Sequence, residues 1–596
     1  MSSNINYSKN NYDNLFKDLE NPLLCNLKNV QKYIPIYKQF FLLNETNYNN
    51  ITLDISECLI SIKEKKSENI YKGFVKKNKK EKNTETFFKF SPLIDPIKYI
   101  TGKYDFNDTK ITSLPTLNSN NEECLSKFLD VNNAAYIDSF FSYLSAKLHN
   151  KGFVHGIQYY GSFLGIKNNF ITNIGDDFEI VSESQSFNQY LGVYFNLQDF
   201  DGEFKKNETC KYKSKLNIKS INNKNLTIKT FDDCDFDNIF KINNDKNDKN
   251  VKNDKNDKIK SNSIEEIYNN DNHNNSNDNN DNDSIYSNCS SRSSNSKLSD
   301  EELSDAENNE NISDTEDDAE DDTEDNDTED NDEDFEDCSD NSEETDIPIF
   351  VSINEFPVQV ICLEKCKNTL DNYIVENEIE NNEWSSIFFQ IIITLVVYQK
   401  VYNFTHNDLH TNNIMYIETD EKFLYYKLDN KLYKVPTYGK IYKIIDFGRS
   451  IYDFNEKNIC SDSFAIGEDA STQYNFGVYF NNKKPRLEPN MSFDLCRLGC
   501  SLFDFFFDEI DEVNNIIKKN NIAKLINDWC TDDKGRNILY KSNGDERYPE
   551  FKLYKMIARS VHNHTPIKQL ENELFSKFII TNIENTDKII DINTLI

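Results

Sequence analysis

Two short polar stretches, each beside an apolar run, contain side chains that could carry out phosphoryl transfer. The first holds Asp408 and Asn413, a carboxylate and an amide spaced as in H-x-D-x-x-x-x-N. The second begins at Asp446, which opens an Asp-Phe-Gly triplet after an apolar strand. A positioned carboxylate can orient or deprotonate a hydroxyl, and carboxylate and amide oxygens suit Mg²⁺. This pair of motifs is typical of phosphoryl-transfer loops.

Occurring in this order, the two motifs resemble the catalytic and metal-binding loops of the protein kinase-like superfamily. The resemblance implies that Asp408 is the catalytic residue, which orients or deprotonates the acceptor hydroxyl. It implies that Asn413 and Asp446 hold Mg²⁺ and, together with Lys89, bind ATP. Lys89 stands between two phenylalanines and matches the strand lysine that contacts the α- and β-phosphates.

The resemblance implies an α+β, two-lobed protein kinase-like fold, with a small β-rich lobe and a large helical lobe. It covers residues 30–200 and 347–580. Shorter patterns at 87–96, 473–476 and 492–499 are similar to those of divergent kinase-like proteins of large DNA viruses of the mimivirus type. We expect a polar tail at 1–26, the small lobe at 27–200, a disordered insertion at 201–346, the hinge and large lobe at 347–580, and a C-terminal tail at 581–596.

The small lobe should place Lys89 on the second strand of a hairpin. Residues 69–75 and 86–91 are strand-like and flank a Lys/Asn-rich turn at 76–83. Apolar residues at three- and four-residue spacing predict a helix over 136–148, capped by Asn133 and ended by Gly152. Two strands are expected after it, at 154–160 and 163–166.

The large lobe should begin with a strand at 358–363 and a connection between the lobes. The further elements expected are a short helix at 369–374, a long buried helix at 384–402, a hairpin of 423–428 and 431–435, a strand at 441–445, a loop at 449–490 and a helix at 492–507. The resemblance implies that Asp494, in the last helix, braces the catalytic loop from beneath.

Composition changes abruptly between residues 201 and 346. A Lys/Asn/Asp repeat at 246–258 gives way to a Ser/Asn tract and then to an Asp/Glu run that reaches Glu344. With few apolar residues, this insertion cannot bury enough surface to offset its chain entropy, so we expect disorder. Its acidity dominates the formal net charge of −35 and could attract basic proteins.

The overall composition excludes several classes of protein. A net charge of −35 and a pI near 4.7 argue against direct nucleic-acid binding, because phosphates would be repelled. The longest apolar run, 387–397, is too short to span a membrane. Thirteen scattered cysteines without ligand spacing, and no signal peptide, indicate a soluble intracellular protein with reduced thiols, in the host cytoplasm or virion if viral. The sequence does not indicate an oligomeric state.

Four departures from the superfamily pattern affect the expected chemistry. Residues 56–68, where a Gly-rich phosphate loop would stand, contain no glycine. Asn407 replaces the Arg that receives an activating phosphate, which argues against activation by loop phosphorylation. His410 replaces a Lys, as in small-molecule and atypical kinases, and no Ala-Pro-Glu closes the activation loop. Asp138 and Glu123 are both candidates for the acid that pairs with Lys89.

The sequence therefore predicts an ATP- and Mg²⁺-dependent kinase that phosphorylates Ser or Thr of proteins. One alternative is a small-molecule kinase of the same superfamily, which His410 favours. The other is a pseudokinase scaffold, which the missing Gly-rich loop favours and which would bind basic partners through its acidic tract.

Overall fold

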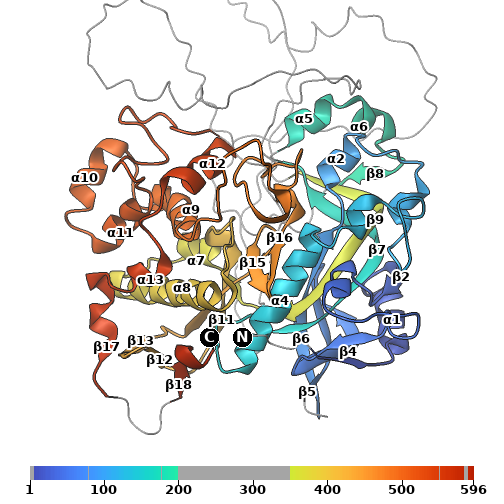
Figure 1. Cartoon of the computed structure of the whole chain (residues 1–596), viewed down its shortest axis with the longest axis horizontal. Coiled ribbons are helices and arrows are strands. Elements are labelled where there is room, and N and C mark those ends of the chain that lie inside the picture. The colour runs from blue at the N-terminus through green and yellow to red at the C-terminus, as the bar shows by residue number, and fades with distance from the viewer. Residues whose placement is uncertain are drawn as a thin grey trace, which may run out of the picture. The chain divides into compact units, whose positions relative to one another are not determined.

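The computed structural model describes residues 6–77, 80–175, 177–198, 349–549, 551–582 and 588–595. All of them belong to one mixed α+β unit, which contains a curled sheet and a group of helices (Figure 1). The predicted disordered insertion, 201–346, lies outside the described residues.

The main sheet is antiparallel and holds seven strands within the described ranges. Its strand order is β2 (Leu27–Gln31), β7 (Tyr159–Asn173), β9 (Phe350–Glu364), β6 (Lys80–Pro92), β5 (Ile70–Lys77) and β4 (Glu57–Lys65), with β8 (Phe195–Leu197) also paired to β9. The predicted hairpin is confirmed as β5 and β6, although its strands reach further and pair Lys77 with Lys80. β6 pairs with β9, so Lys89 lies opposite Ile361.

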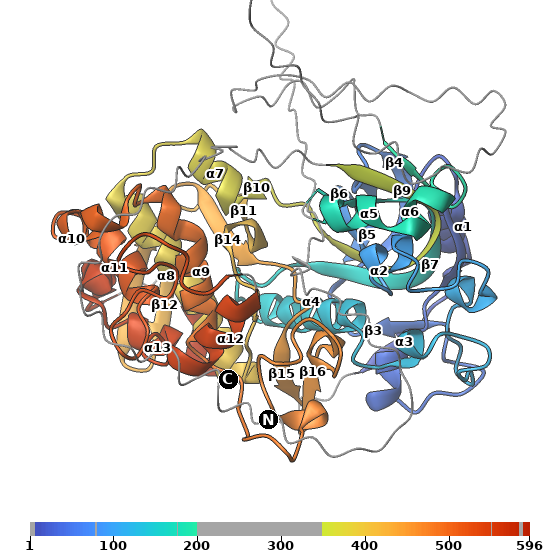
Figure 2. The same cartoon turned by 90° about the horizontal axis from the view of Figure 1, so that it is seen from above.

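Helix α4 (Ala134–Asn150) confirms the predicted helix. It begins at the predicted cap, where Asn133 Oδ1 accepts a hydrogen bond from the Ala135 N–H at 3.0 Å. α4 packs on β7 and β9, and its Ser145 hydroxyl lies 2.7 Å from that of Tyr398 on α8 (Asn381–Tyr402). In Figure 2, α4 accordingly lies between the sheet and the helical part of the molecule.

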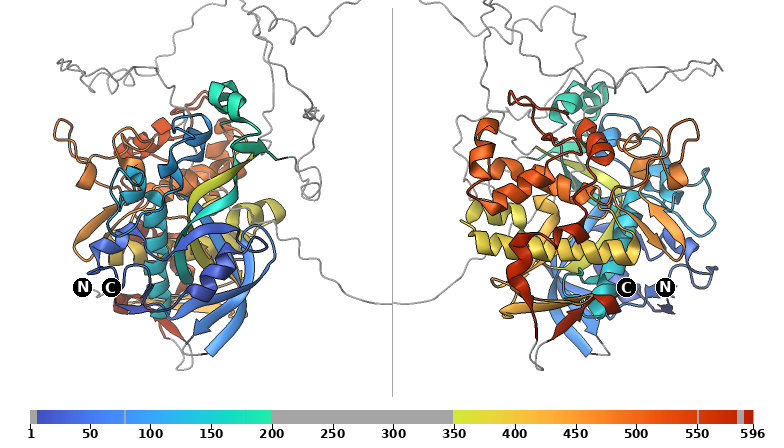
Figure 3. Two further views of the ribbon diagram at one scale, coloured as in Figure 1. Left: turned by 90° about the vertical axis from the view of Figure 1, so that its right-hand side faces the viewer. Right: turned by 60° about the vertical axis from the view of Figure 1, so that its left-hand side comes forward.

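α8 is the central helix of the second half of the chain and confirms the predicted long helix. Within the described ranges it is the one helix long and apolar enough to span a membrane, but 83% of its most apolar window is buried inside the fold. It contacts α11 (Asn521–Trp529) and α13 (Pro566–Gln569), and α11 packs on α9 (Phe493–Leu502). In the right-hand view of Figure 3, the yellow α8 runs beside the orange and red C-terminal helices.

Three small sheets lie in the second half of the chain. β11 (Ile414–Glu418) pairs with β14 (Lys440–Ile444) and β10 (Asn368–Thr369); β12 (Phe423–Leu428) and β13 (Lys431–Pro436) form the predicted hairpin, flanked by β17 (Ile579–Ile580) and β18 (Ile589–Asp591); β15 (Ile451–Phe454) pairs with β16 (Lys457–Cys460). The remaining helices of four or more residues in this half are α7 (Leu370–Glu376), α10 (Val513–Ile516) and α12 (Phe551–Ser560).

The predictions of tails at 1–26 and 581–596 are wrong for the residues of these ranges that the structure describes. β1 (Tyr7–Lys9) pairs with β3 (Ile51–Leu53), and α1 (Asp13–Glu20) buries Leu15 and Leu19. These two leucines are four residues apart, so they form one apolar stripe that a mainly polar composition conceals. At the other end, β18 pairs with β12, and Ile592 is fully buried.

Three predicted element boundaries are also corrected. The strands expected at 154–160 and 163–166 are one strand, β7, because residues 153–158 form the turns that precede it. The expected loop at 449–490 contains the β15–β16 hairpin. The helix expected at 492–507 ends at Leu502 and continues as a 3₁₀ turn, Phe503–Phe505.

Two buried polar residues tie the main sheet and α4 to the second half of the chain. Lys443 on β14 is fully buried and donates to Glu364 on β9, at 2.7 Å, and to the Gly156 carbonyl. His155 contacts the Tyr442 carbonyl and the Tyr426 hydroxyl, at 2.8 and 2.7 Å. Because both side chains are hydrogen-bonded across the junction, they fix β14 relative to β9 and to the turn between α4 and β7.

Candidate active site

The segment after α8 is held from beneath by a buried carboxylate. α8 ends at Asn403, and the backbone N–H groups of His406 and Asn407 both donate to Asp494 at 2.9 Å. All three residues of this contact have no exposed surface. Asp494 is therefore located where the resemblance implied a brace for the catalytic loop.

His406 links this loop to the strand that leads to Asp446. Its Nδ1 accepts from the Asp408 N–H at 3.3 Å, so its Nε2 carries the proton and donates to the Ile445 carbonyl at 2.9 Å. The ring thus fixes the spacing between Asp408 and the turn that contains Asp446.

Strand register brings Asn413 and Asp446 together. Ile414 pairs with Ile444 in the β11–β14 ladder, and the Ile445 N–H donates to the Asn413 carbonyl at 3.0 Å. Residues that flank a paired position lie close together, so Asn413 and Asp446, although distant in sequence, lie at the same end of this sheet.

The Asn413 amide is oriented by two acceptors. Its Nδ2 donates to the Asp408 backbone carbonyl at 2.9 Å and contacts His410 Nε2 at 3.0 Å. Both amide hydrogens are then used on the protein, which leaves the side-chain oxygen, Oδ1, as the atom suited to a cation.

Lys89 lies between two carboxylates. Its Nζ is 2.7 Å from Asp138 Oδ2 on α4 and 2.7 Å from Asp446 Oδ1. Asp138 is thus the acid partner of Lys89, whereas the other candidate, Glu123, is exposed. Asp446 has a φ of +64°. A non-glycine residue in this region costs free energy, and such residues are found preferentially at functional sites.

Electrostatics differ among the three carboxylates of the site. Burial raises the pKa of Asp138, even though Lys89 acts in the opposite direction. Burial acts to raise the pKa of Asp446 as well, but the contact with Lys89 outweighs burial and lowers this pKa. Burial of Asp408 is outweighed by nearby cations, Arg449 foremost, so its pKa falls to about 2. Asp408 is therefore an anion throughout the neutral range.

These side chains line one cavity of about 860 Å³. Lys89, Asp138, Asp408, Asn413 and Asp446 all contribute to its wall. Apolar side chains and the end of β9 with the residues that follow it contribute further parts of the wall, which include Ile70, Ile157, Met415, Leu363, Glu364 and Cys366. A cavity of this volume, with apolar side chains on part of its wall and many charged side chains of both signs on the rest, suits a small organic ligand that carries an anionic group.

The donor set fits Mg²⁺ with a phosphate-bearing ligand. Asn413 Oδ1 and the Asp446 carboxylate are hard oxygens from neighbouring positions, and Mg²⁺ commonly takes one or two protein ligands and completes its shell with water and phosphate. Within the described residues, no group of three or more His, Cys, Asp and Glu side chains forms a metal site. Lys89 supplies a cation beside Asp446.

The region expected to hold phosphates is a strand rather than a glycine loop. Residues 57–65 form β4, and its turn to β5 closes with the Lys66 N–H donating to the Ile70 carbonyl at 2.8 Å. Neither β4 nor this turn lines the cavity, apart from Ile70 at the start of β5.

Asn407 holds the segment that follows Asp446 through neutral hydrogen bonds. Its Oδ1 accepts from the Tyr474 hydroxyl at 3.0 Å, and its Nδ2 donates to the Arg449 carbonyl at 3.2 Å. Asn407 also has a φ of +62°, which an asparagine tolerates better than most residues.

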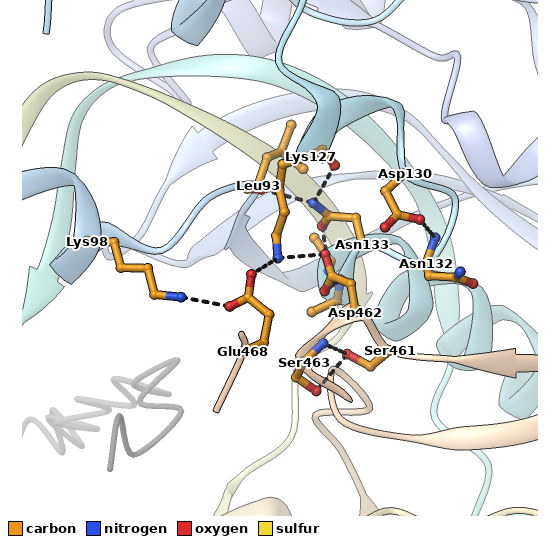
Figure 4. Close-up of polar contacts among 12 residues, drawn as sticks. Leu93, Lys98, Lys127, Asp130, Asn132, Asn133, Ser461, Asp462, Ser463 and Glu468 are labelled. Atoms are coloured by element: carbon orange, nitrogen blue, oxygen red, sulfur yellow. Dashed lines mark hydrogen bonds and ion pairs between the residues drawn. The ribbon is translucent and has the colours of Figure 1, made fainter. Parts of the chain in front are cut away.

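A hydrogen bond attaches the same segment to the start of α4, and ion pairs attach it to two lysines that precede α4 (Figure 4). Asp462 Oδ1 accepts from the Ala134 N–H at 3.0 Å, and its Oδ2 lies 2.9 Å from Lys127 Nζ. Glu468 joins the network, because its carboxylate pairs with Lys127 at 3.0 Å and with Lys98 at 2.7 Å. We call these four side chains the α4 clamp: Lys98, Lys127, Asp462 and Glu468.

Sequence reasoning missed three residues that interact with the Asp408 carboxylate. Tyr554 donates its hydroxyl to Asp408 Oδ1 at 2.7 Å, and Arg449 and Arg497 lower the pKa of this carboxyl. Tyr554 is 146 residues from Asp408 in the chain and belongs to no motif, so only the fold could reveal it.

No family model matches the chain, and no curated protein matches it. Its function must therefore be inferred from the geometry of the site.

Proposed function

We propose that this chain is an ATP- and Mg²⁺-dependent phosphotransferase of the protein kinase-like superfamily, which transfers the γ-phosphoryl group to Ser or Thr hydroxyls of proteins. The observation that carries the proposal is the position of Lys89, 2.7 Å from both Asp138 and Asp446 in a cavity that also contains Asp408 and Asn413. Phosphoryl transfer depends on such positioning and on charge neutralisation more than on covalent chemistry.

The arrangement of elements supports the same proposal. The strand lysine, Lys89, is paired with an acid from a helix, Asp138, as the superfamily requires of an active site. A small β-rich lobe and a large helical lobe would then correspond to the main sheet with α4 and to the helices around α8, with the cavity between them.

Each predicted site residue has a role in this proposal. Lys89 binds the α- and β-phosphates, Asn413 and Asp446 hold Mg²⁺, and Asp408 orients the acceptor hydroxyl. Bound Mg²⁺ would neutralise charge on the β- and γ-phosphates. Asp408, an anion with a pKa of about 2, is a weak base, so it acts chiefly by orientation and takes the proton late in transfer.

A small-molecule kinase is the second candidate, and His410 is the observation that favours it. Burial lowers the pKa of His410 to about 4, and its Nε2 is bound to the Asn413 amide. His410 is therefore neutral at pH 7 and cannot replace the phosphate-binding lysine of protein kinases. The acidic tract, which lies outside the described residues, would in either case be free to recruit basic proteins.

The test is transfer from γ-labelled ATP with Mg²⁺, using the purified full chain and a cell lysate. Label in the protein fraction supports the proposed function, and label confined to small molecules supports the second candidate. Asp408→Asn should bind Mg-ATP normally and lose transfer by about two to four orders of magnitude. A wild-type chain that binds no Mg-ATP at millimolar concentration would overturn both kinase proposals and leave the pseudokinase scaffold as the remaining alternative.

A further inference from the structure

A three-residue hydrogen-bond relay ends on the catalytic-loop carboxylate. Arg497 Nε donates to the Tyr554 hydroxyl at 3.0 Å, and this hydroxyl donates to Asp408 Oδ1 at 2.7 Å. The phenol oxygen thus accepts one bond and donates one. Because a donor that also accepts from a cation is polarised, the bond to Asp408 is strengthened.

The relay is buried and its members are packed in place. Tyr554 is 7% exposed and Arg497 is 6% exposed. The Tyr554 ring stacks on Phe551 with centroids 5.1 Å apart, and the guanidinium carbons of Arg497 and Arg449 lie 5.2 and 5.7 Å from its centroid. This packing holds the Tyr554 ring in place, so its hydroxyl points at Asp408.

Burial also keeps the phenol in its donating form. It raises the pKa of Tyr554 above the usual value, although Arg497 acts in the opposite direction. The residue consequently retains its proton at neutral pH and can only stabilise the anionic form of Asp408. This is a different task from that of Asp494, which binds backbone N–H groups of the loop and not the Asp408 carboxylate.

We infer that Tyr554 is a positioning residue for phosphoryl transfer: its hydroxyl holds Oδ1 of Asp408 and thereby directs Oδ2 at the acceptor hydroxyl. The inference rests on the proposed function. In the transfer, the acceptor oxygen bonds to the γ-phosphorus while the bond from that phosphorus to the bridging oxygen breaks. ADP leaves with the bonding electrons, and the acceptor proton passes to Asp408 Oδ2.

A purely structural role for Tyr554 is the rival explanation, since its ring packs from α12 against Phe493 on α9. Tyr554→Phe separates the two roles, because it keeps the ring and removes only the hydroxyl. Tyr540→Phe is the matched control: the Tyr540 hydroxyl also donates to a carboxylate, Asp504, at 3.0 Å, but outside the cavity wall.

We expect Tyr554→Phe to lower kcat by about ten- to a hundred-fold, as for a misplaced catalytic group, with KM for ATP within about two-fold of wild type. Tyr540→Phe should change neither quantity.

A double variant excludes a general loss of structure. If Tyr554 acts through Asp408, adding Tyr554→Phe to Asp408→Asn should lower the residual transfer no further, since the two effects are not additive. An independent further loss in the double variant, or a wild-type kcat in Tyr554→Phe, would overturn the inference. Absence of transfer by the wild-type chain would instead overturn the proposed function.

Discussion

The backbone N–H of Phe447 donates to Asp138 Oδ1 at 3.0 Å, while the other oxygen of the same carboxylate pairs with Lys89. One side chain on α4 therefore connects β6 to the turn that follows β14. Since each partner also touches the cavity, displacement of α4 would disturb the lysine and the proposed metal ligand Asp446 together.

Replacing Asp138 by Asn should weaken nucleotide binding. If the new amide oxygen still accepts the hydrogen bond from the Phe447 N–H, the amide NH₂ group faces the Lys89 ammonium. Both groups are hydrogen-bond donors, so the favourable contact is lost. We expect Mg-ATP affinity to fall by about ten-fold, as measured by calorimetry, because a buried charge loses a partner. Glu123→Gln, at an exposed acid, is the control. Unchanged affinity in Asp138→Asn would show that Asp446 alone orients Lys89.

Asp446→Asn should remove the Mg²⁺-dependent part of the stabilisation by ATP. A ligand that binds only the folded state raises the melting temperature by mass action, and this variant removes the charge that attracts the metal. Asn tolerates the positive φ at this position, so little strain is introduced. Asp429→Asn is the control, because Asp429 also has a positive φ, +51°, but sits in the β12–β13 turn. A full Mg²⁺-dependent shift in Asp446→Asn would remove this residue from the metal site.

The loop motifs predicted the members of the site because local sequence determines them. Asn413 directly precedes β11, Asp446 follows β14 by two residues, and Lys89 lies in the buried second half of β6. The Lys89 partner remained undecided between Asp138 and Glu123, because a helix pattern predicts burial and not the contact that a buried residue makes. Tyr554 was beyond prediction, since the contact of α12 with Asp408 joins residues that are far apart in the sequence.

The errors in the fold arise from similar causes. The α1 helix was missed because two leucines four residues apart are a weak signal within polar sequence. β18 was missed because an edge strand of three residues is defined by its partner, β12, more than by its own composition.

The α4 clamp should make activity independent of phosphorylation. Asp462 supplies at the N-terminus of α4 the negative charge that a phosphate would otherwise provide, and Lys127 holds it. We expect phosphatase-treated protein to retain full transfer. Asp462→Ala should lower the free energy of unfolding by about 2 kcal/mol, because it removes a buried carboxylate that accepts from the Ala134 N–H and pairs with the partly exposed Lys127. Loss of activity after phosphatase treatment would show that the clamp is insufficient.

Stability should fall as the pH drops below about 6.5, with His155 as one cause. Burial lowers the pKa of His155 to about 3 in the folded state. Between the ordinary His pKa of about 6.5 and that value, the unfolded chain binds a proton that the folded chain does not, so the free energy of unfolding decreases by up to about 1.4 kcal/mol per pH unit. His155→Gln should make the decline between pH 6.5 and pH 5 shallower in denaturant titrations. An equal slope in both proteins would contradict the assignment.

His410→Lys should distinguish protein from small-molecule substrates. His410 is neutral at pH 7 because burial lowers its pKa to about 4, and it accepts from the Asn413 amide. Lysine restores the cation that protein kinases place there for the γ-phosphate, at the cost of the contact to Asn413. If the acceptor is a protein hydroxyl, the variant should keep part of its transfer to protein, measured with labelled ATP. If the acceptor is a small molecule that His410 contacts, turnover should be abolished while Mg-ATP binding persists. Loss of Mg-ATP binding itself would show that the role of His410 is to orient Asn413.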